Sequence, residues 1–244
     1  MMKSFISVPN LPDNKISLAA VGSYPQIISA LHSIGINTVS FENKNLPEEV
    51  CRHQDMILCH TGGNTVFLDP SQDKAVLENK GFSVKYSCAA EKEYPEDVKL
   101  NIAVSDNFFI CNKKTCDKAL LNALEAAGKH PVYVNQGYTK CSVCFVTENA
   151  VITEDEGIYK ALKAFGADTL LISKGDIYLS DNHYGFFGGS TGKIDKSTLA
   201  VTGSLSTHSD GEKIRDFCKK HGVEILELTQ DRIIDVGGIL PLKA

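Results

Sequence analysis

Five glycines divide the chain, and each follows a stretch whose apolar residues recur with helical spacing. They are Gly35, Gly81, Gly128, Gly166 and Gly222, which are 46, 47, 38 and 56 residues apart. A helix ends easily at glycine, because only glycine adopts the left-handed backbone conformation without steric cost. The pattern therefore predicts five helices, each followed by a strand.

The predicted helices bury one face. In the fourth stretch the positions eight, five, four and one before the glycine are Ile158, Ala161, Leu162 and Phe165. This spacing lines one side of a helix with apolar groups. The first, third and fifth stretches repeat it, whereas the second keeps only Val76 and Leu77 between polar residues.

Before each predicted helix lies a pair of short apolar segments separated by turn residues, a pattern typical of a β-hairpin. The clearest pair is 142–146 and 150–153, around a turn at Glu148 and Asn149. The other pairs are 5–8 with 16–19, 56–59 with 65–68, 102–104 with 108–110, and 185–187 with 199–201. The repeating unit is therefore strand, strand, helix, strand.

The pattern of residues 233–242 predicts a strand that no helix follows. A final strand that pairs with the first unit would remove the two exposed sheet edges of a linear array. We therefore predict a single domain, a five-fold pseudosymmetric ring, with units near 1–50, 51–97, 98–139, 140–182 and 183–232 and a closing strand at 233–242. A doubly wound flavodoxin-like fold is the alternative, but it has one strand per helix where this sequence has about three.

Composition narrows the class of ligand. The 244 residues carry a net charge of −5 and are 43% hydrophobic, ordinary values for a globular protein. The negative charge disfavours nucleic acid and anionic membranes, so a small soluble ligand is the expected partner. We expect no membrane span, a cytoplasmic location and eight reduced cysteines. The oligomeric state is left open.

A ring of five β-β-α-β units resembles the pentein fold, the five-bladed α/β propeller of guanidine-modifying enzymes such as arginine deiminase and dimethylarginine dimethylaminohydrolase. The resemblance covers residues 5–242. Two short segments carry the local similarity: Lys140-Cys141-Ser142-Val143, similar to the Cys-Ser-Val run of the dimethylaminohydrolases, and the hairpin 144–152. The chain looks most like a bacterial branch of that fold, so the resemblance supports the fold more strongly than the activity.

The resemblance implies a ligand at the centre of the ring, a cysteine that attacks a guanidinium carbon, a histidine that moves protons, and carboxylates that hold the cation. The family's nucleophile normally lies near the C-terminus, but here that segment holds Asp235 and Gly237-Gly238 and has no cysteine. Cys141 is the best substitute, because Lys140 beside it could lower its pKa. The alternative is that Cys141 packs within a strand.

Candidate partners for Cys141 come from several segments. His60, which ends a strand before Gly62-Gly63-Asn64, is the expected base, with Asp55 just upstream in the same strand and Asn64 as a ligand contact. Asp55 and Asp235 are the expected substrate carboxylates, and His208 is a further candidate at the rim. An ordinary hairpin turn beside a solvated imidazole explains His60 equally well.

Two sequence motifs, a glycine-rich loop and a Cys-x-x-Cys pair, do not have the surrounding secondary structure that their usual functions require. Gly188 and Gly189 precede Ser190-Thr191-Gly192-Lys193, but a strand and not a helix follows, so no phosphate-binding loop is predicted. Instead these glycines allow close backbone approach to a ligand. Cys141 and Cys144 have Cys-x-x-Cys spacing, yet they would point to opposite faces of a strand, unless a turn intervenes. We predict no metal and no cofactor.

Two functions follow. The first is a hydrolase or transferase that acts on a guanidino or similar small cationic compound, with Cys141 as nucleophile. The second is a pentein without catalysis that binds a small molecule or a macromolecule, as in the ribosome-binding translation initiation factor 6 of the same fold. Release of citrulline or ammonia from guanidino compounds would separate them.

Overall fold

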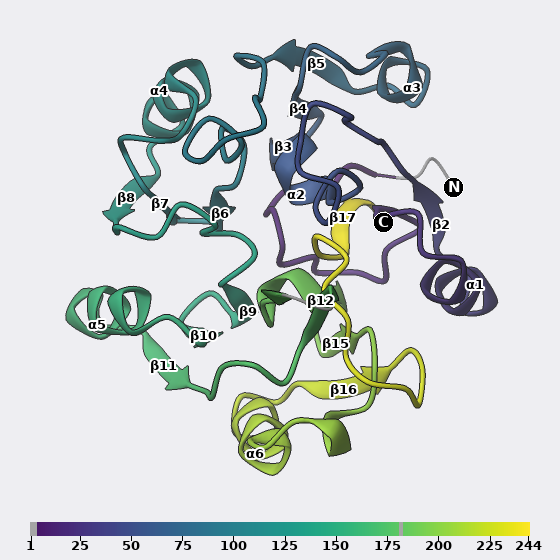
Figure 1. Ribbon diagram of the computed structural model, residues 1–244, viewed down its shortest axis with the longest axis vertical. Coiled ribbons are helices and arrows are strands. Elements are labelled where there is room, and N and C mark those ends of the chain that lie inside the picture. The colour runs from purple at the N-terminus through teal and green to yellow at the C-terminus, as the bar shows by residue number, and fades with distance from the viewer. Residues whose placement is uncertain (1–3, 181–182) are drawn as a thin grey trace.

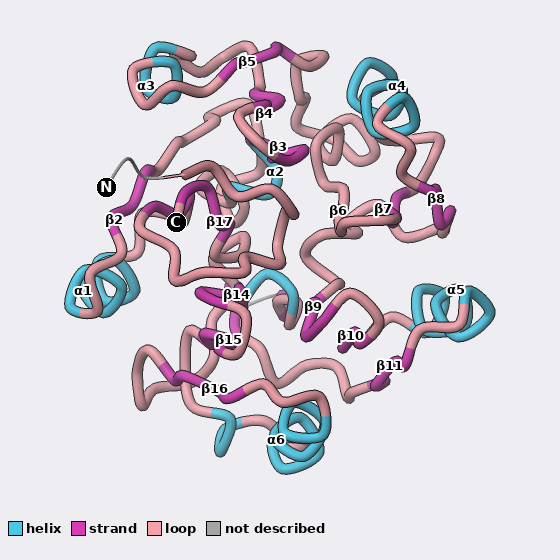
Figure 2. The backbone as a smooth tube through the Cα atoms, turned by 180° about the vertical axis from the view of Figure 1, so that it is seen from behind, coloured by secondary structure: helices cyan, strands magenta, loops and turns pink. Residues whose placement is uncertain are grey.

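The computed structural model describes residues 4–180 and 183–244. Within these ranges the strands form five separate three-stranded sheets and one two-stranded sheet. The helices that connect the middle strand to the last strand of each three-stranded sheet lie at the periphery, and the sheets are arranged around a common centre (Figure 1). Seen from behind, β3, β6, β9, β14 and β17 lie on the inner side of their sheets (Figure 2).

Four of the sheets repeat one topology in chain order. A first strand pairs antiparallel with the middle strand, a helix follows, and the last strand pairs parallel with the middle strand. The first of these sheets has β3(Leu58–Gly62), β4(Thr65–Leu68) and β5(Ser83–Tyr86), with helix α3(Ala75–Glu78), and the second has β6(Ala103–Val104), β7(Phe108–Cys111) and β8(His130–Tyr133), with helix α4(Lys118–Ala126). The third has β9(Cys144–Thr147), β10(Ala150–Thr153) and β11(Asp168–Leu171), with helix α5(Glu156–Phe165). The fourth has β14(Thr191–Asp195), β15(Thr198–Val201) and β16(Glu224–Glu227), with helix α6(Gly211–Lys220).

The fifth sheet joins the two ends of the chain. Its middle strand β1(Leu18–Ala20) pairs parallel with β2(Asn37–Val39), across α1(Pro25–Ser33), and antiparallel with β17(Leu240–Lys243). The expected hairpin of 5–8 with 16–19 is wrong: Phe5 forms only an isolated bridge to Lys243. Strand β17 takes that place, so the predicted pairing between the closing segment and the first unit is observed.

Two further expectations need correction. Met56 and Ile57 belong to a short helix, α2(Gln54–Ile57), so the strand expected at 56–59 begins at Leu58. Residues 185–187 are not the first strand of the last sheet; that strand is β14, and a 3-10 helix, η1(Gly188–Ser190), precedes it. A second 3-10 helix, η2(Leu205–Thr207), precedes α6, and β12(Tyr178–Ser180) pairs with β13(His183–Tyr184) as the extra hairpin.

The core lies between the helices and the sheets, in five clusters of buried apolar residues. The predicted helix faces are buried in part: Ile158 and Leu162 of α5 and Leu120 and Leu124 of α4 are fully inaccessible, but Phe165 at the end of α5 is 46% exposed. Gly166 ends α5 with a φ of +97°, the left-handed conformation that its position predicted. Among the described residues, no helix combines the length and apolarity that a membrane span requires.

Candidate functional site

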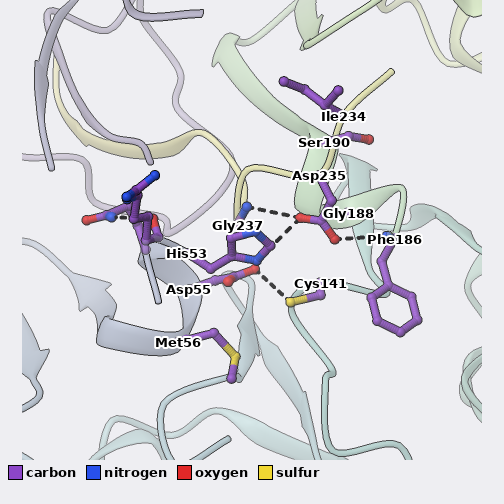
Figure 3. Close-up of polar contacts among 12 residues, drawn as sticks. His53, Asp55, Met56, Cys141, Phe186, Gly188, Ser190, Ile234, Asp235 and Gly237 are labelled. Atoms are coloured by element: carbon purple, nitrogen blue, oxygen red, sulfur yellow. Dashed lines mark hydrogen bonds and ion pairs between the residues drawn. The ribbon is translucent and has the colours of Figure 1, made fainter. Parts of the chain in front are cut away.

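A buried cluster of polar side chains lies where α2, the turn before β9 and the closing segment before β17 meet (Figure 3). His53, Asp55, Cys141 and Asp235 form it, and each is at most 2% exposed. Residues 53 and 55 flank the start of α2, Cys141 lies in a turn, and Asp235 lies in the segment that precedes β17. The cluster therefore joins three parts of the chain that are far apart in sequence.

The cluster has two short contacts. The Cys141 thiol donates a hydrogen bond to Oδ2 of Asp55 at 3.1 Å. Nδ1 of His53 lies 3.6 Å from Oδ1 of Asp235. A donor atom of His53, one of Asp55 and Sγ of Cys141 all lie within 4.8 Å of one another. The imidazole thus sits between the thiol and a carboxylate, an arrangement in which a histidine can exchange protons with a sulfur nucleophile.

Backbone packing fixes the two aspartates. The N–H of Asp55 donates to the carbonyl of Gly237 at 3.2 Å. Asp235 accepts hydrogen bonds from the N–H groups of Phe186 at 2.9 Å and Gly237 at 3.0 Å. Gly237 has a φ of +73°, and a Cβ there would lie 2.4 Å from Cα of His53. Only glycine therefore allows the closing segment to pack against α2.

Asn101 positions the cysteine turn. Its Nδ2 donates to Sγ of Cys141 at 3.1 Å, and its Oδ1 accepts from the N–H groups of Lys140 at 2.7 Å and Cys141 at 3.3 Å. A hydrogen bond donated to sulfur favours the thiolate, so Asn101 opposes the other influences on this thiol. No local pattern in the sequence marks Asn101 as part of the site.

Electrostatics keep the thiol protonated in the free protein. Burial raises the pKa of Cys141 well above its usual value, and the charges of Asp55 and Asp235 raise it further. Burial also raises the pKa of Asp55, although His53 and Lys140 partly offset this. A cation bound between the two carboxylates would remove the influences that oppose the thiolate, since an added positive charge favours the deprotonated form.

A cavity of about 420 Å³ adjoins the cluster. His53, Cys141 and Asp235 line its inner end, and Tyr138, Tyr184 and Phe186 form an aromatic wall. The rings of Tyr138 and Phe186 stack with centroids 6.1 Å apart, and the Tyr138 hydroxyl donates to Asp97 at 2.5 Å. Cavities with an apolar lining and a few convergent polar groups are typical of small-molecule sites.

The structure separates His60 from this cavity. His60 lies in β3, and its Nε2 is 2.8 Å from the carbonyl oxygen of Gly63. It lines a second, much smaller cavity of about 20 Å³ together with Asp55 and Lys140, whereas Cys141 does not line that cavity. A volume of this size holds about one water molecule. Asp55 therefore has His53 and Cys141 on one side and the His60 cavity on the other.

Lys140 and the glycine pair lie next to the cluster. Nζ of Lys140 donates to the carbonyl of Gly188 at 3.2 Å. The N–H of Gly189 donates to the carbonyl of Cys141 at 2.8 Å, and a Cβ on Gly189 would lie 2.1 Å from Oδ1 of Asp235. The glycines thus permit close packing of η1 against Cys141 and Asp235, whereas their predicted approach to a ligand stays a prediction.

Two predicted ligand contacts lie elsewhere. Asn64 is exposed at the tip of the β3–β4 hairpin and lines neither cavity. His208 is buried beside η2, where its Nδ1 accepts from the N–H of Asp210 at 3.0 Å and lies 3.6 Å from Asp176. The structure thus does not bring either residue to the cysteine.

The sequence predicted Cys141 in a strand, but this prediction is wrong. Residues 139–142 form a turn, and β9 begins at Cys144. The turn lets Cys141 face the cavity while Cys144 packs in the apolar core, and both are free thiols. His53, Asp55 and Cys141 do form a donor set of the kind that zinc accepts, a grouping that the sequence analysis did not foresee.

His53 is the principal residue that the sequence analysis missed as part of the site. Its position in the sequence, two residues before Asp55, could have indicated its role. Two side chains this close to the start of a helix can face the same side. Among the residues that the structure describes, neither of its buried ring nitrogens has a hydrogen-bond partner. Buried polar atoms in proteins nearly always have such a partner, so these two nitrogens at the end of a cavity are available to a ligand.

Comparisons with known proteins agree with this architecture. The model of the Family of unknown function (DUF6873) matches residues 20–240, so the chain belongs to that family. No curated protein matches. Among solved structures, an amidinotransferase from Microseira wollei in the saxitoxin biosynthetic pathway has 10% identity and a TM-score of 0.55, with 91% of each chain covered.

Two further structures are similar. An agmatine deiminase from C. jejuni has 10% identity and a TM-score of 0.54 over 91% of this chain and 90% of its own. A dimethylarginine dimethylaminohydrolase from Pseudomonas aeruginosa has 9% identity and a TM-score of 0.52 over 87% of this chain and 92% of its own. The chain therefore has the mixed α/β fold of the pentein superfamily, as its sequence predicted.

Proposed function

We propose that this chain, a member of the DUF6873 family with the pentein fold, is a cysteine-dependent hydrolase or transferase that acts on a guanidino or similar small cationic compound. The observation that carries the proposal is the convergence of Cys141, His53 and Asp235 at the inner end of a cavity, with Asp55 in contact with Cys141 behind that lining. The proposal includes a five-bladed arrangement with pseudo-five-fold symmetry, in which this cavity lies at the centre.

The proposed reaction begins when the two carboxylates bind the guanidinium. Burial of a cation requires such pairing, because an unpaired charge is costly to remove from water. The bound charge lowers the thiol pKa, His53 accepts the thiol proton, and the thiolate attacks the guanidinium carbon. The C–N bond to the leaving amine breaks as His53 returns the proton to that nitrogen. Water or an acceptor amine then adds to the same carbon and gives a proton to His53, the C–S bond breaks, and His53 returns that proton to the sulfur of Cys141.

Incubation of the purified protein with guanidino compounds tests the proposal. We expect release of ammonia or an amine together with a ureido product, and loss of both in Cys141→Ser. The protein should first be treated with a chelator, because His53, Asp55 and Cys141 could also bind zinc. Activity that disappears with the chelator and returns with zinc, or no turnover of any compound, would contradict the proposal.

A second function is binding without catalysis. It is favoured by the hydrogen bond from the Cys141 thiol to Asp55 and by the raised pKa of that thiol, which hold the sulfur in its unreactive form. A guanidino compound that binds with Cys141 intact and is recovered unchanged would support this function over the first.

A further inference from the structure

We infer that the cavity selects a guanidine whose other end is a second positive charge, an amine rather than a carboxylate. This inference rests on the proposed function and deepens it. It depends on the charges and shape of the cavity lining, and it is tested by binding, which needs no turnover at Cys141.

The charged side chains of the cavity lining have one sign. Asp235 lies at the inner end and Glu49 at the rim, and of the described residues that line the cavity none is lysine or arginine. Lys140, the cation nearest in sequence to Cys141, lines the small cavity on the other side of Asp55 instead. A ligand carboxylate would therefore lose water here without gaining a cationic partner, which is costly.

Glu49 has a free carboxylate. Within the described residues its side chain makes no hydrogen bond and no ion pair, and the residue is exposed at the mouth of the cavity. The inner end of the same cavity is buried: His53 is 1% exposed, and neither ring nitrogen makes a hydrogen bond within the described residues, although Nδ1 lies 3.6 Å from Asp235. The cavity thus has polar groups without a hydrogen bond at both ends, one buried and one at the surface.

The wall between these ends is aromatic. The rings of Tyr138 and Phe186, which line the cavity, stack with centroids 6.1 Å apart and an interplanar angle of 24°, and Tyr94 continues the stack outside the lining, 5.9 Å from Tyr138 at 25°. Tyr184 packs edge-on against Phe186. An aromatic surface beside carboxylates attracts cations and packs against methylene groups, so it suits an alkyl chain that carries a charge at each end.

Binding to the Cys141→Ser protein, which cannot turn the ligand over, tests the inference. Three probes differ only at the tail: 4-guanidinobutylamine, butylguanidine and 4-guanidinobutanoate. We expect the amine to bind roughly fivefold more tightly than the neutral compound, the effect of one partly screened ion pair. The carboxylate should bind most weakly. Isothermal titration at low and high salt measures this order.

Variants of the rim identify the group responsible. Glu49→Gln should remove the preference for the amine and leave butylguanidine unchanged, whereas Glu48→Gln, at an exposed neighbour that does not line the cavity, should change neither. Glu49→Lys should make the carboxylate compound the tighter ligand. Folding of each variant is checked by its circular dichroism spectrum and thermal midpoint.

The outcomes separate the two proposals. Equal binding of the three probes, or tightest binding of the carboxylate compound, would overturn this inference and leave a guanidino ligand intact. Binding of 1,4-diaminobutane in a Glu49-dependent way, with no binding of any guanidine, would contradict the proposed function and retain the charge preference. Binding of none of the compounds would overturn both.

Discussion

The thiol of Cys141 and the carboxylate of Asp55 share a hydrogen bond of 3.1 Å across 86 positions of sequence. The thiol is the donor, so this contact stabilises the protonated sulfur and opposes the hydrogen bond that Asn101 donates to the same atom. The state of the sulfur therefore depends on the charge at position 55, and so on whatever cation binds beside it.

Asp55→Asn should make Cys141 more reactive. Removal of the carboxylate charge lowers the thiol pKa, and at a pH below that pKa the alkylation rate rises about tenfold for each unit by which it falls. The measurement is the pH profile of iodoacetamide labelling with peptide mapping. A Cys88→Ser background is needed, because Cys88 is the exposed cysteine and would react first. An unchanged profile would show that the carboxylate does not control this thiol.

The two histidines should differ in their effect on turnover. If the protein modifies a guanidino compound, His53→Gln should lower kcat by about 100-fold or more, the usual contribution of a general acid–base group. His60→Gln should have less than a tenfold effect, because the imidazole lines the small cavity and Cys141 does not. Steady-state kinetics on the same substrate decide between them. The opposite order would restore His60, the base that the sequence predicted.

Gly189→Ala should be destabilising. The added methyl group would lie 2.1 Å from Oδ1 of Asp235, and both groups are buried, so the closing segment or η1 must shift. We expect a loss of about 1–3 kcal/mol in the free energy of unfolding, as for other overpacked sites. Gly157→Ala is the control, because Gly157 is exposed in α5, has no left-handed φ, and its added methyl group would meet only a side-chain oxygen of Asp155 at 3.0 Å. Urea denaturation that finds the two variants equally stable would argue against the close packing of Gly189 on Asp235.

Glu154 should make stability depend on pH. Its carboxyl is buried. Within the part of the chain that the structure describes, Oε1 has no hydrogen-bond partner, and Oε2 accepts a 3.3 Å hydrogen bond from the N–H of Phe187. Burial raises its pKa to about 8. Because the folded state then binds this proton more tightly than the unfolded state, stability is retained below the unfolded pKa near 4.5 and is lost as pH rises toward 8.

Glu154→Gln removes this dependence. The variant should gain stability relative to the natural protein as pH rises from about 5 to 8, by up to about 1.4 kcal/mol per pH unit. Urea denaturation across this range measures the difference, with Glu91→Gln at an exposed position as the control. A constant difference between the proteins would mean that Glu154 titrates as an ordinary surface carboxyl.

Much of the fold was predictable because its determinants are local. A helix that buries one face needs apolar residues at fixed spacing, and the faces predicted for residues 156–165 and 118–126 are the faces that the structure buries. Glycine at a helix end is likewise a local requirement of the backbone. The wrong predictions concern strands whose partner is distant in sequence. Residues 5–8 form no hairpin with 16–19, because β17 occupies that edge of β1.

The candidate site was predictable only in part. Cys141, Asp55 and Asp235 were named from the sequence, and the structure brings all three together. Their grouping with His53, rather than with His60, depends on a turn at 139–142 and on the packing of Gly237 against His53. Neither contact leaves a periodic signal in the chain.

The sequence by itself determined the repeating unit, the apolar face of each helix and the kinds of side chain available for chemistry, since these depend on neighbours within a few residues. Only the tertiary structure decided which of those side chains meet. Asn101, Cys141 and Asp235 come from three loops whose positions are set by the packing of separate sheets around one centre. The charge and reactivity of Cys141 follow from that packing, because burial and nearby carboxylates act through space and not along the chain.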